Sequence, residues 1–141
     1  LEPQADLAEQ HFGEWQGRTY EELKKGDLGH WHRFWLAPAL TAPPGGESFA
    51  QLMERVGTAV ERIGKANAGR DIVAVTHGGT IRAALGHALS LDPEGALRLS
   101  VDNCSLTRID HFVGASGSHD PDGTHAWRVE FHNLSPARLA A

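Results

Sequence analysis

The sequence predicts an α/β fold built on a mostly parallel sheet. A long amphipathic segment at residues 48–67 is followed by a short, nearly continuous apolar run at 71–76, a glycine pair and a second amphipathic segment at 80–89. The order helix, buried strand, glycine turn and helix is typical of α/β proteins. Strands of a parallel sheet are covered on both faces, so they contain apolar runs rather than alternating patterns.

The clearest helix is expected over residues 48–67. Ser48 and Gln51 have the spacing of a capping box, and Gly69 follows the last periodic residue. The apolar residues of one helical face are Phe49, Leu52, Met53, Val56, Val60 and Ile63. The second helix, at 80–89, is expected to bury Ile81, Ala84, Leu85 and Ala88.

Weaker patterns predict the remaining elements. Thr19 starts a short helix at 20–25, an aromatic-rich helix follows at 30–36, and strands are expected at 105–111 and 126–132. In the last strand apolar and charged residues alternate, which indicates one exposed face. Two segments rich in glycine, proline, serine or aspartate are expected to be loops, at 37–46 and 114–123.

Composition excludes several classes of function. The chain has 141 residues, which fits one domain. Its 18 acidic and 13 basic residues give a net charge of −5, so it lacks the cationic surface needed to bind nucleic acid. No apolar run is long enough to span a membrane. One cysteine and no secretory leader predict a cytoplasmic location, and the oligomeric state stays open.

The residues at 75–80, Val-Thr-His-Gly-Gly-Thr, are the strongest chemical signal. The strand at 71–76 ends just before His77, and ligands of open α/β sheets bind at the carboxyl ends of strands. Gly78 and Gly79 would let backbone N–H groups at the start of the next helix face an anion such as phosphate. A histidine there can act as nucleophile, proton carrier or cationic clamp, or it can simply cap the turn.

A candidate carboxylate lies upstream. Glu9 precedes a turn punctuated by glycines and aromatic residues at 11–17. Taken by itself, this residue fits a solvated surface glutamate better than a functional group.

Three blocks in order resemble the phosphoglycerate-mutase-like branch of the histidine phosphatase superfamily. Residues 7–17 resemble the pattern L-x-E-x-x-x-G-x-W-E-G, with Gln16 in place of glutamate. Residues 44–48 resemble P-G-G-E-S, with Arg55 in the following helix, and residues 75–79 resemble V-T-H-G-G. The resemblance implies a three-layer α/β/α sandwich with a mostly parallel sheet.

The resemblance also implies roles for individual residues. Glu9 would be the general acid that protonates the leaving oxygen, and His77 would clamp the transferring phosphoryl group. The amide of Gly78 would help to bind phosphate, and Glu47 would support the site from the pocket mouth. Residues 30–41 correspond to the region that covers the substrate.

One defining motif of that family is absent. No Arg-His-Gly occurs in the sequence, although its histidine is the nucleophile of the family, and the second phosphate-binding arginine is not identified either. Residues 1–141 are therefore expected to be the C-terminal part of a single histidine phosphatase domain, with its N-terminal part missing. Because loss of a nucleophile costs many orders of magnitude in rate, this chain alone is expected to be inactive.

The implied activity is hydrolysis of a phosphomonoester through a phosphohistidine, with a small phosphorylated metabolite as substrate. An α-ribazole phosphatase and a broad-specificity phosphatase both fit, and no metal or cofactor is expected. Two alternatives are a phosphoglycerate mutase and a non-catalytic module that binds a phosphate ligand. Nine histidines also raise the possibility of a metal module, but the chain has no cysteine pair and no His-Glu-x-x-His motif.

Overall fold

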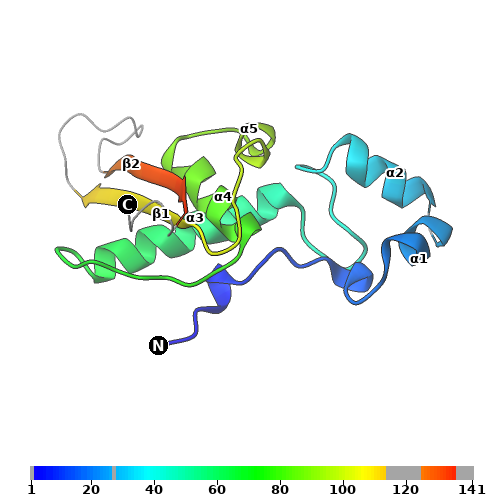
Figure 1. Ribbon diagram of the computed structural model, residues 1–141, viewed down its shortest axis with the longest axis horizontal. Helices are drawn as coiled ribbons and strands as arrows, with labels where there is room; N and C mark the ends of the chain where they lie inside the picture. The colour runs from blue at the N-terminus through cyan, green and yellow to red at the C-terminus, as the bar shows by residue number, and fades with distance from the viewer. Residues whose placement is uncertain (1, 27, 114–124, 136–141) are drawn as a thin grey trace.

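The computed structural model describes residues 2–26, 28–113 and 125–135. Figure 1 shows a body of helices and two strands, with a smaller helical lobe at one end of the molecule. The elements in chain order are η1 (Ala5–Leu7), η2 (Gly13–Trp15), α1 (Tyr20–Lys25), α2 (Leu28–Leu36), α3 (Phe49–Ala66), α4 (Gly78–Ala88), α5 (Pro93–Leu97), β1 (Leu106–Val113) and β2 (His125–Leu134).

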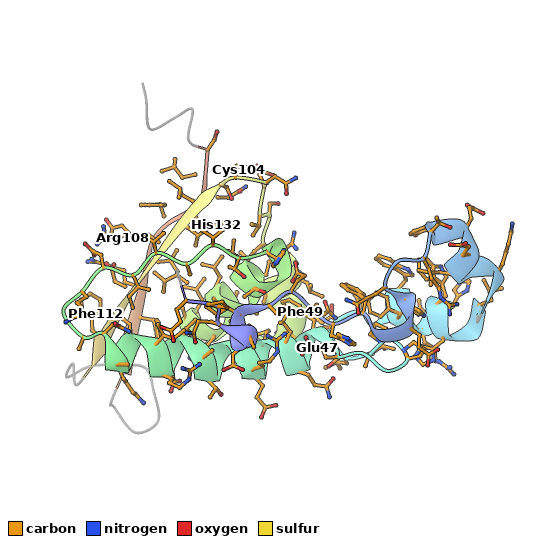
Figure 2. All side chains as sticks on the ribbon, turned by 90° about the horizontal axis from the view of Figure 1, so that it is seen from below. Glu47, Phe49, Cys104, Arg108, Phe112 and His132 are labelled. Atoms are coloured by element: carbon orange, nitrogen blue, oxygen red, sulfur yellow. The ribbon has the colours of Figure 1, made fainter. Side chains whose placement is uncertain are left out.

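The core lies between α3, α4 and α5. Its fully buried members are Phe49, Leu52, Val56, Ala83 and Ala96. The long helix begins and ends as predicted, because Ser48 accepts a hydrogen bond from the Gln51 amide and Gln51 bonds back to the Ser48 amide. Figure 2 shows Glu47 and Phe49 at the end of α3 nearer the helical lobe, and Arg108 and Phe112 on β1 in the body.

Helix α4 differs in detail from the prediction. It begins at Gly78, two residues before the expected start, with His77 at the N-cap position. Its buried residues are Thr80, Ala83, Leu85 and Gly86, whereas Ile81 is half-buried, so the buried face is rotated relative to the predicted one. The short helix α5 was not predicted, although Asp92 caps it and Pro93 occupies its first position.

The two predicted C-terminal strands are present and pair with each other. Strands β1 and β2 are antiparallel, with Asp110 opposite Arg128 and His111 opposite Trp127. The Trp127 ring stacks on His111, with centroids 3.9 Å apart, and lies edge-on to His87 of α4 at 5.5 Å. These ring contacts attach the sheet to the helices.

The predicted buried strand at 71–76 is wrong for this structure. The segment is not part of a sheet: the described residues contain one two-stranded antiparallel sheet, β1–β2, and a mostly parallel three-layer sandwich is not seen. Val73 and Val75 are 85% and 90% exposed, and Ile72 is 47% exposed. The apolar pattern of a buried strand is present, but no second strand among the described residues lies beside it to pair with its backbone.

The helical lobe is held together by aromatic rings. Its two helices, α1 and α2, follow the predicted positions, and α1 begins with a capping box between Thr19 and Glu22. The ring of Trp15 in η2 lies edge-on to Phe34, with ring centroids 5.1 Å apart. The centroids of the Tyr20 and Trp31 rings are 4.6 Å apart. The lobe therefore has a small core of its own.

The remaining expectations concern loops and membranes. Residues 37–46 form a turn-rich connection without regular structure, as predicted, whereas the loop expected at 114–123 lies outside the described residues. Over the part of the chain that the structure describes, no helix combines the length and apolar character needed to cross a bilayer.

Candidate active site

Glu9 contacts the first turn of α4, the helix that begins immediately after His77. Oxygen Oε2 of Glu9 accepts a hydrogen bond of 3.0 Å from the Gly79 amide, and Oε1 accepts one of 2.9 Å from the Gln10 amide. First-turn amides have no acceptor within their helix, and the helix dipole favours an anion there. The carboxylate therefore stabilises the early start of α4 and lies beside the predicted phosphate-binding glycines.

This contact requires a glycine at position 79. A Cβ atom on Gly79 would overlap Oε1 of Glu9 and would lie 3.1 Å from its carboxyl carbon. By contrast, a Cβ atom on Gly78 would meet only Arg82 at 3.8 Å and Val101 at 4.0 Å, which are ordinary contact distances. The two adjacent glycines therefore have different functions in the structure.

Two threonines flanking the His-Gly-Gly residues bind the backbone near Glu9. The hydroxyl of Thr76 donates a hydrogen bond of 2.6 Å to the Leu7 carbonyl, and the hydroxyl of Thr80 donates one of 2.9 Å to the Ala8 carbonyl. These two hydrogen bonds to the backbone were not predicted from the sequence. Their signal was present as threonine on both sides of His-Gly-Gly, but only the fold reveals the partners.

His77 is exposed to solvent, and Gly78 is partly exposed. His77 is exposed at the N-cap of α4, and its side chain makes no capping hydrogen bond. No hydrogen bond to the Gly78 amide is found within the described residues, so this donor is available. An exposed imidazole, a free first-turn amide and a nearby carboxylate suit a phosphorylated ligand with a leaving oxygen to protonate.

Glu47, expected to support the site from the pocket mouth, forms an ion pair with Arg55. Its carboxylate binds Arg55, with Nη2 2.6 Å from Oε1 and Nε 3.3 Å from Oε2, and Oε1 also accepts the His11 amide at 3.0 Å. Partial burial opposes the charge, but the hydrogen bonds from Arg55 and His11 prevail and hold the pKa of Glu47 below its ordinary value. Glu47 therefore stays ionised and holds the backbone near Glu9.

The first two blocks of the sequence are joined backbone to backbone. The Glu47 amide donates to the His11 carbonyl at 2.8 Å, and the Glu14 amide donates to the Pro44 carbonyl at 2.9 Å. Gly13 has a φ of +54°, and a Cβ atom there would collide with the backbone of residues 44–46. This close approach explains one glycine of each block, Gly13 and Gly46.

A cavity of about 360 Å³ lies in the helical lobe, apart from the residues predicted for chemistry. Its lining residues are Glu14, Trp15, Arg18, Leu23, Gly26, His30 and Pro44. The residues expected to cover the substrate, 30–41, thus contribute His30 to this cavity.

Metal binding has no support among the described residues. They contain no group of three histidine, cysteine, aspartate or glutamate side chains placed to hold an ion, and His119 lies outside them.

The comparisons with known proteins agree on one family. The model for the histidine phosphatase superfamily (branch 1) matches residues 1–116. A glucosyl-3-phosphoglycerate phosphatase of Mycolicibacterium vanbaalenii is 30% identical over 137 residues, which cover 92% of this chain and 60% of that protein. The chain spans a smaller share, 31%, of the first curated relatives that it matches.

Solved structures extend this similarity to the fold. A mycobacterial glucosyl-3-phosphoglycerate phosphatase superimposes with a TM-score of 0.70 at 26% identity, over 94% of this chain and 64% of that one. An α-ribazole phosphatase from Shigella flexneri gives a TM-score of 0.72 at 20% identity, over 94% of this chain and 61% of that one, and supports the fold alone.

Proposed function

The chain belongs to the histidine phosphatase superfamily (branch 1), and on that premise we propose that it forms part of a phosphomonoester hydrolase. The observation that supports this most directly is the Glu9 carboxylate bound to the Gly79 amide, two residues after His77. A carboxyl group thus lies at the helix start that also carries an imidazole and a free amide, and we propose that a phosphate monoester binds there.

Each of these groups has a place in phosphoryl transfer. Catalysis of this reaction consists mainly of positioning the phosphoryl group and neutralising charge on its oxygens. His77 and the Gly78 amide would bind the phosphoryl oxygens from the N-terminus of α4, where the helix dipole adds to the attraction. Glu9, in its protonated form, would donate a proton to the leaving oxygen. The backbone just before Glu9 is held by the hydrogen bonds of Thr76 to the Leu7 carbonyl and of Thr80 to the Ala8 carbonyl.

The nucleophile of the family is proposed to lie on polypeptide outside residues 1–141. The Arg-His-Gly motif does not occur in the sequence, and the chain spans only part of its relatives' lengths. The segment 71–76 has apolar side chains open to solvent and no paired backbone among the described residues. A strand from the rest of the protein placed there would complete a sheet and bring a nucleophile to the carboxyl end of this segment.

The proposed substrate is a small phosphorylated metabolite. One relative is a phosphatase named for glucosyl-3-phosphoglycerate. An α-ribazole phosphatase and a broad-specificity enzyme both stay within the proposal. A phosphoglycerate mutase is a second candidate, favoured by a relative from Photorhabdus laumondii named as a probable phosphoglycerate mutase at 30% identity. A module that binds phosphate without turnover is the third.

Phosphate release from phosphate esters tests the proposal in two steps. The 141-residue chain should show little turnover of p-nitrophenyl phosphate, because it contains no Arg-His-Gly nucleophile. In a form that does hydrolyse phosphate esters, His77→Ala and Glu9→Gln should each reduce turnover of an alkyl phosphate by at least ~10²-fold. Glu54→Gln, at an exposed position on α3, serves as control and should leave turnover unchanged.

The outcomes separate the candidate functions. Unchanged turnover in both variants would contradict the assignment of His77 and Glu9. Saturable binding of inorganic phosphate without turnover, in every form tested, would favour the binding module. With a phosphoglycerate in place of p-nitrophenyl phosphate, transfer of the phosphoryl group to the second hydroxyl of the glycerate rather than to water would favour the mutase.

A further inference from the structure

The guanidinium of Arg55 binds the backbone just before Glu9. Its Nη1 atom donates to the Asp6 carbonyl at 2.8 Å and lies 3.3 Å from the Ala8 carbonyl, while Nη2 lies 3.4 Å from the same Ala8 oxygen. Arg55 is on α3, far away in sequence from the segment that it binds. One arginine therefore holds two carbonyls of the segment that leads into Glu9.

Glu47 completes this arrangement on the other side of Glu9. It orients the guanidinium by accepting from Nε and Nη2, and its Oε1 atom also accepts from the His11 amide at 3.0 Å. The Gln10 side chain donates to the Glu47 carbonyl at 3.0 Å. The pair thus contacts the main chain both before and after Glu9, with side chains only 27% and 18% exposed for Arg55 and Glu47.

The geometry depends on the planar fork of arginine. Three of its nitrogens, Nε, Nη1 and Nη2, are engaged at once with two carbonyls and one carboxylate. A lysine ammonium carries the same charge but is a point donor on a flexible stem, so it cannot reproduce this set of contacts. A neighbouring ion pair is different in kind: Arg62 binds the Asp6 side chain at 2.9 Å, with both residues more than half exposed.

We infer that Arg55, oriented by Glu47, is a positioning residue that places the Glu9 carboxylate on the first turn of α4. This inference rests on the proposed function in one respect, namely that Glu9 is the proton donor. The contacts themselves involve neither substrate nor nucleophile, so they can be tested on the 141-residue chain.

The Gly79 amide reports the position of Glu9. Because a first-turn amide has no acceptor within its helix, its protection from hydrogen exchange depends on the Glu9 carboxylate. The experiment measures amide exchange by NMR on the ¹⁵N-labelled chain, together with its thermal midpoint. Arg55→Lys and Glu47→Gln are the test variants, Arg62→Lys is the matched control on the same helix, and Glu9→Gln defines the signal of a displaced carboxylate.

Exchange at Gly79 should rise at least ~10-fold in Arg55→Lys and in Glu47→Gln, while amides of the α3 core keep their protection. The chemical shift of the Gly79 amide should move toward its value in Glu9→Gln. Arg62→Lys should leave both observables unchanged. Glu47→Gln, which preserves the size of the side chain, keeps the test decisive if Arg55→Lys does not fold.

Several results would overturn the inference. Unchanged exchange at Gly79 in a folded variant would show that the pair does not position Glu9. An equal rise at Gly79 and in the α3 core would show a general stabilising function, as would failure of both variants to fold. None of these results depends on turnover, so they are distinguishable from failure of the proposed function.

A hydrolysing form of the protein would add a kinetic readout. A misplaced proton donor slows esters with basic leaving groups most, because good leaving groups need little protonation. Arg55→Lys should therefore lower kcat for an alkyl phosphate by at least ~10-fold more than for p-nitrophenyl phosphate, with KM nearly unchanged. Equal losses on both esters would contradict a function that acts through Glu9.

Discussion

Replacing Gly79 with alanine should separate the two glycines that follow His77. A Cβ atom at position 79 overlaps Oε1 of Glu9 and lies 3.1 Å from its carboxyl carbon and 3.4 Å from Oε2. The carboxylate has to move away, and the Gly79 amide then loses its acceptor. Because both groups are partly buried, solvent replaces this hydrogen bond only incompletely.

The expected loss follows from two opposing terms. A hydrogen bond to a charged group contributes ~1.5–3 kcal/mol, and leaving its donor unsatisfied removes that contribution. Replacing glycine by alanine within a helix returns up to ~1 kcal/mol. Gly79→Ala should therefore lower the free energy of unfolding by ~0.5–2 kcal/mol.

Urea denaturation followed by far-ultraviolet circular dichroism measures this difference. Gly78→Ala is the control, since a Cβ atom there meets its neighbours at 3.8 Å or more. It should leave the free energy of unfolding unchanged or raise it by up to ~1 kcal/mol. Equal stabilities of Gly78→Ala and Gly79→Ala would refute the reasoning, because they would show that Glu9 does not occupy the first turn of α4.

Three further predictions concern other parts of the chain. Gly13→Ala forces a Cβ atom into the backbone of residues 44–46 at a positive φ, whereas Gly17→Ala has only the positive φ to overcome. Thermal denaturation should therefore show a larger loss of stability for Gly13→Ala, and equal losses would contradict the close approach. The lowered pKa of Glu47 stabilises the folded chain at pH values above the ordinary glutamate pKa, and this stabilisation is lost as the pH falls through the lower pKa of the folded state. The difference in free energy of unfolding between the parent and Glu47→Gln should therefore shrink in acid. Denaturation at several pH values measures this difference, and a constant difference would contradict the prediction. The side chains of Val73 and Val75 are exposed, so replacing either by threonine should change the free energy of unfolding by less than ~0.5 kcal/mol in urea titrations. A larger loss would show that these side chains are buried in solution.

Local signals in the sequence predicted the helices well. The capping boxes at Thr19 and Ser48 place the starts of α1 and α3 correctly, because each box is formed within four residues. The start of α4 was predicted two residues late, since glycines disfavour helix and the carboxylate that stabilises them comes from Glu9, 70 residues upstream of Gly79. A distant partner of this kind has no local signal.

The strand at 71–76 shows the limit of pattern reading. Its apolar run is typical of a buried parallel strand, but burial needs partners, and none is found among the described residues. The candidate site had a similar limit. The fold brings Glu9 next to the residues after His77. The contacts of Arg55, Thr76 and Thr80 with the backbone could not be predicted from composition or spacing.

The helical lobe leaves the body and returns to it at nearly the same point. The His11 carbonyl and the Glu47 amide, which mark the two crossings, are hydrogen-bonded at 2.8 Å. Residues 12–46 are thus an insertion whose two ends lie side by side. The rest of the fold, here called the frame, contains Glu9 and His77. A lobe of different length or composition could be exchanged at this junction without moving the frame. The cavity of the lobe and the chemistry of the frame could therefore be altered independently, by evolution or by design.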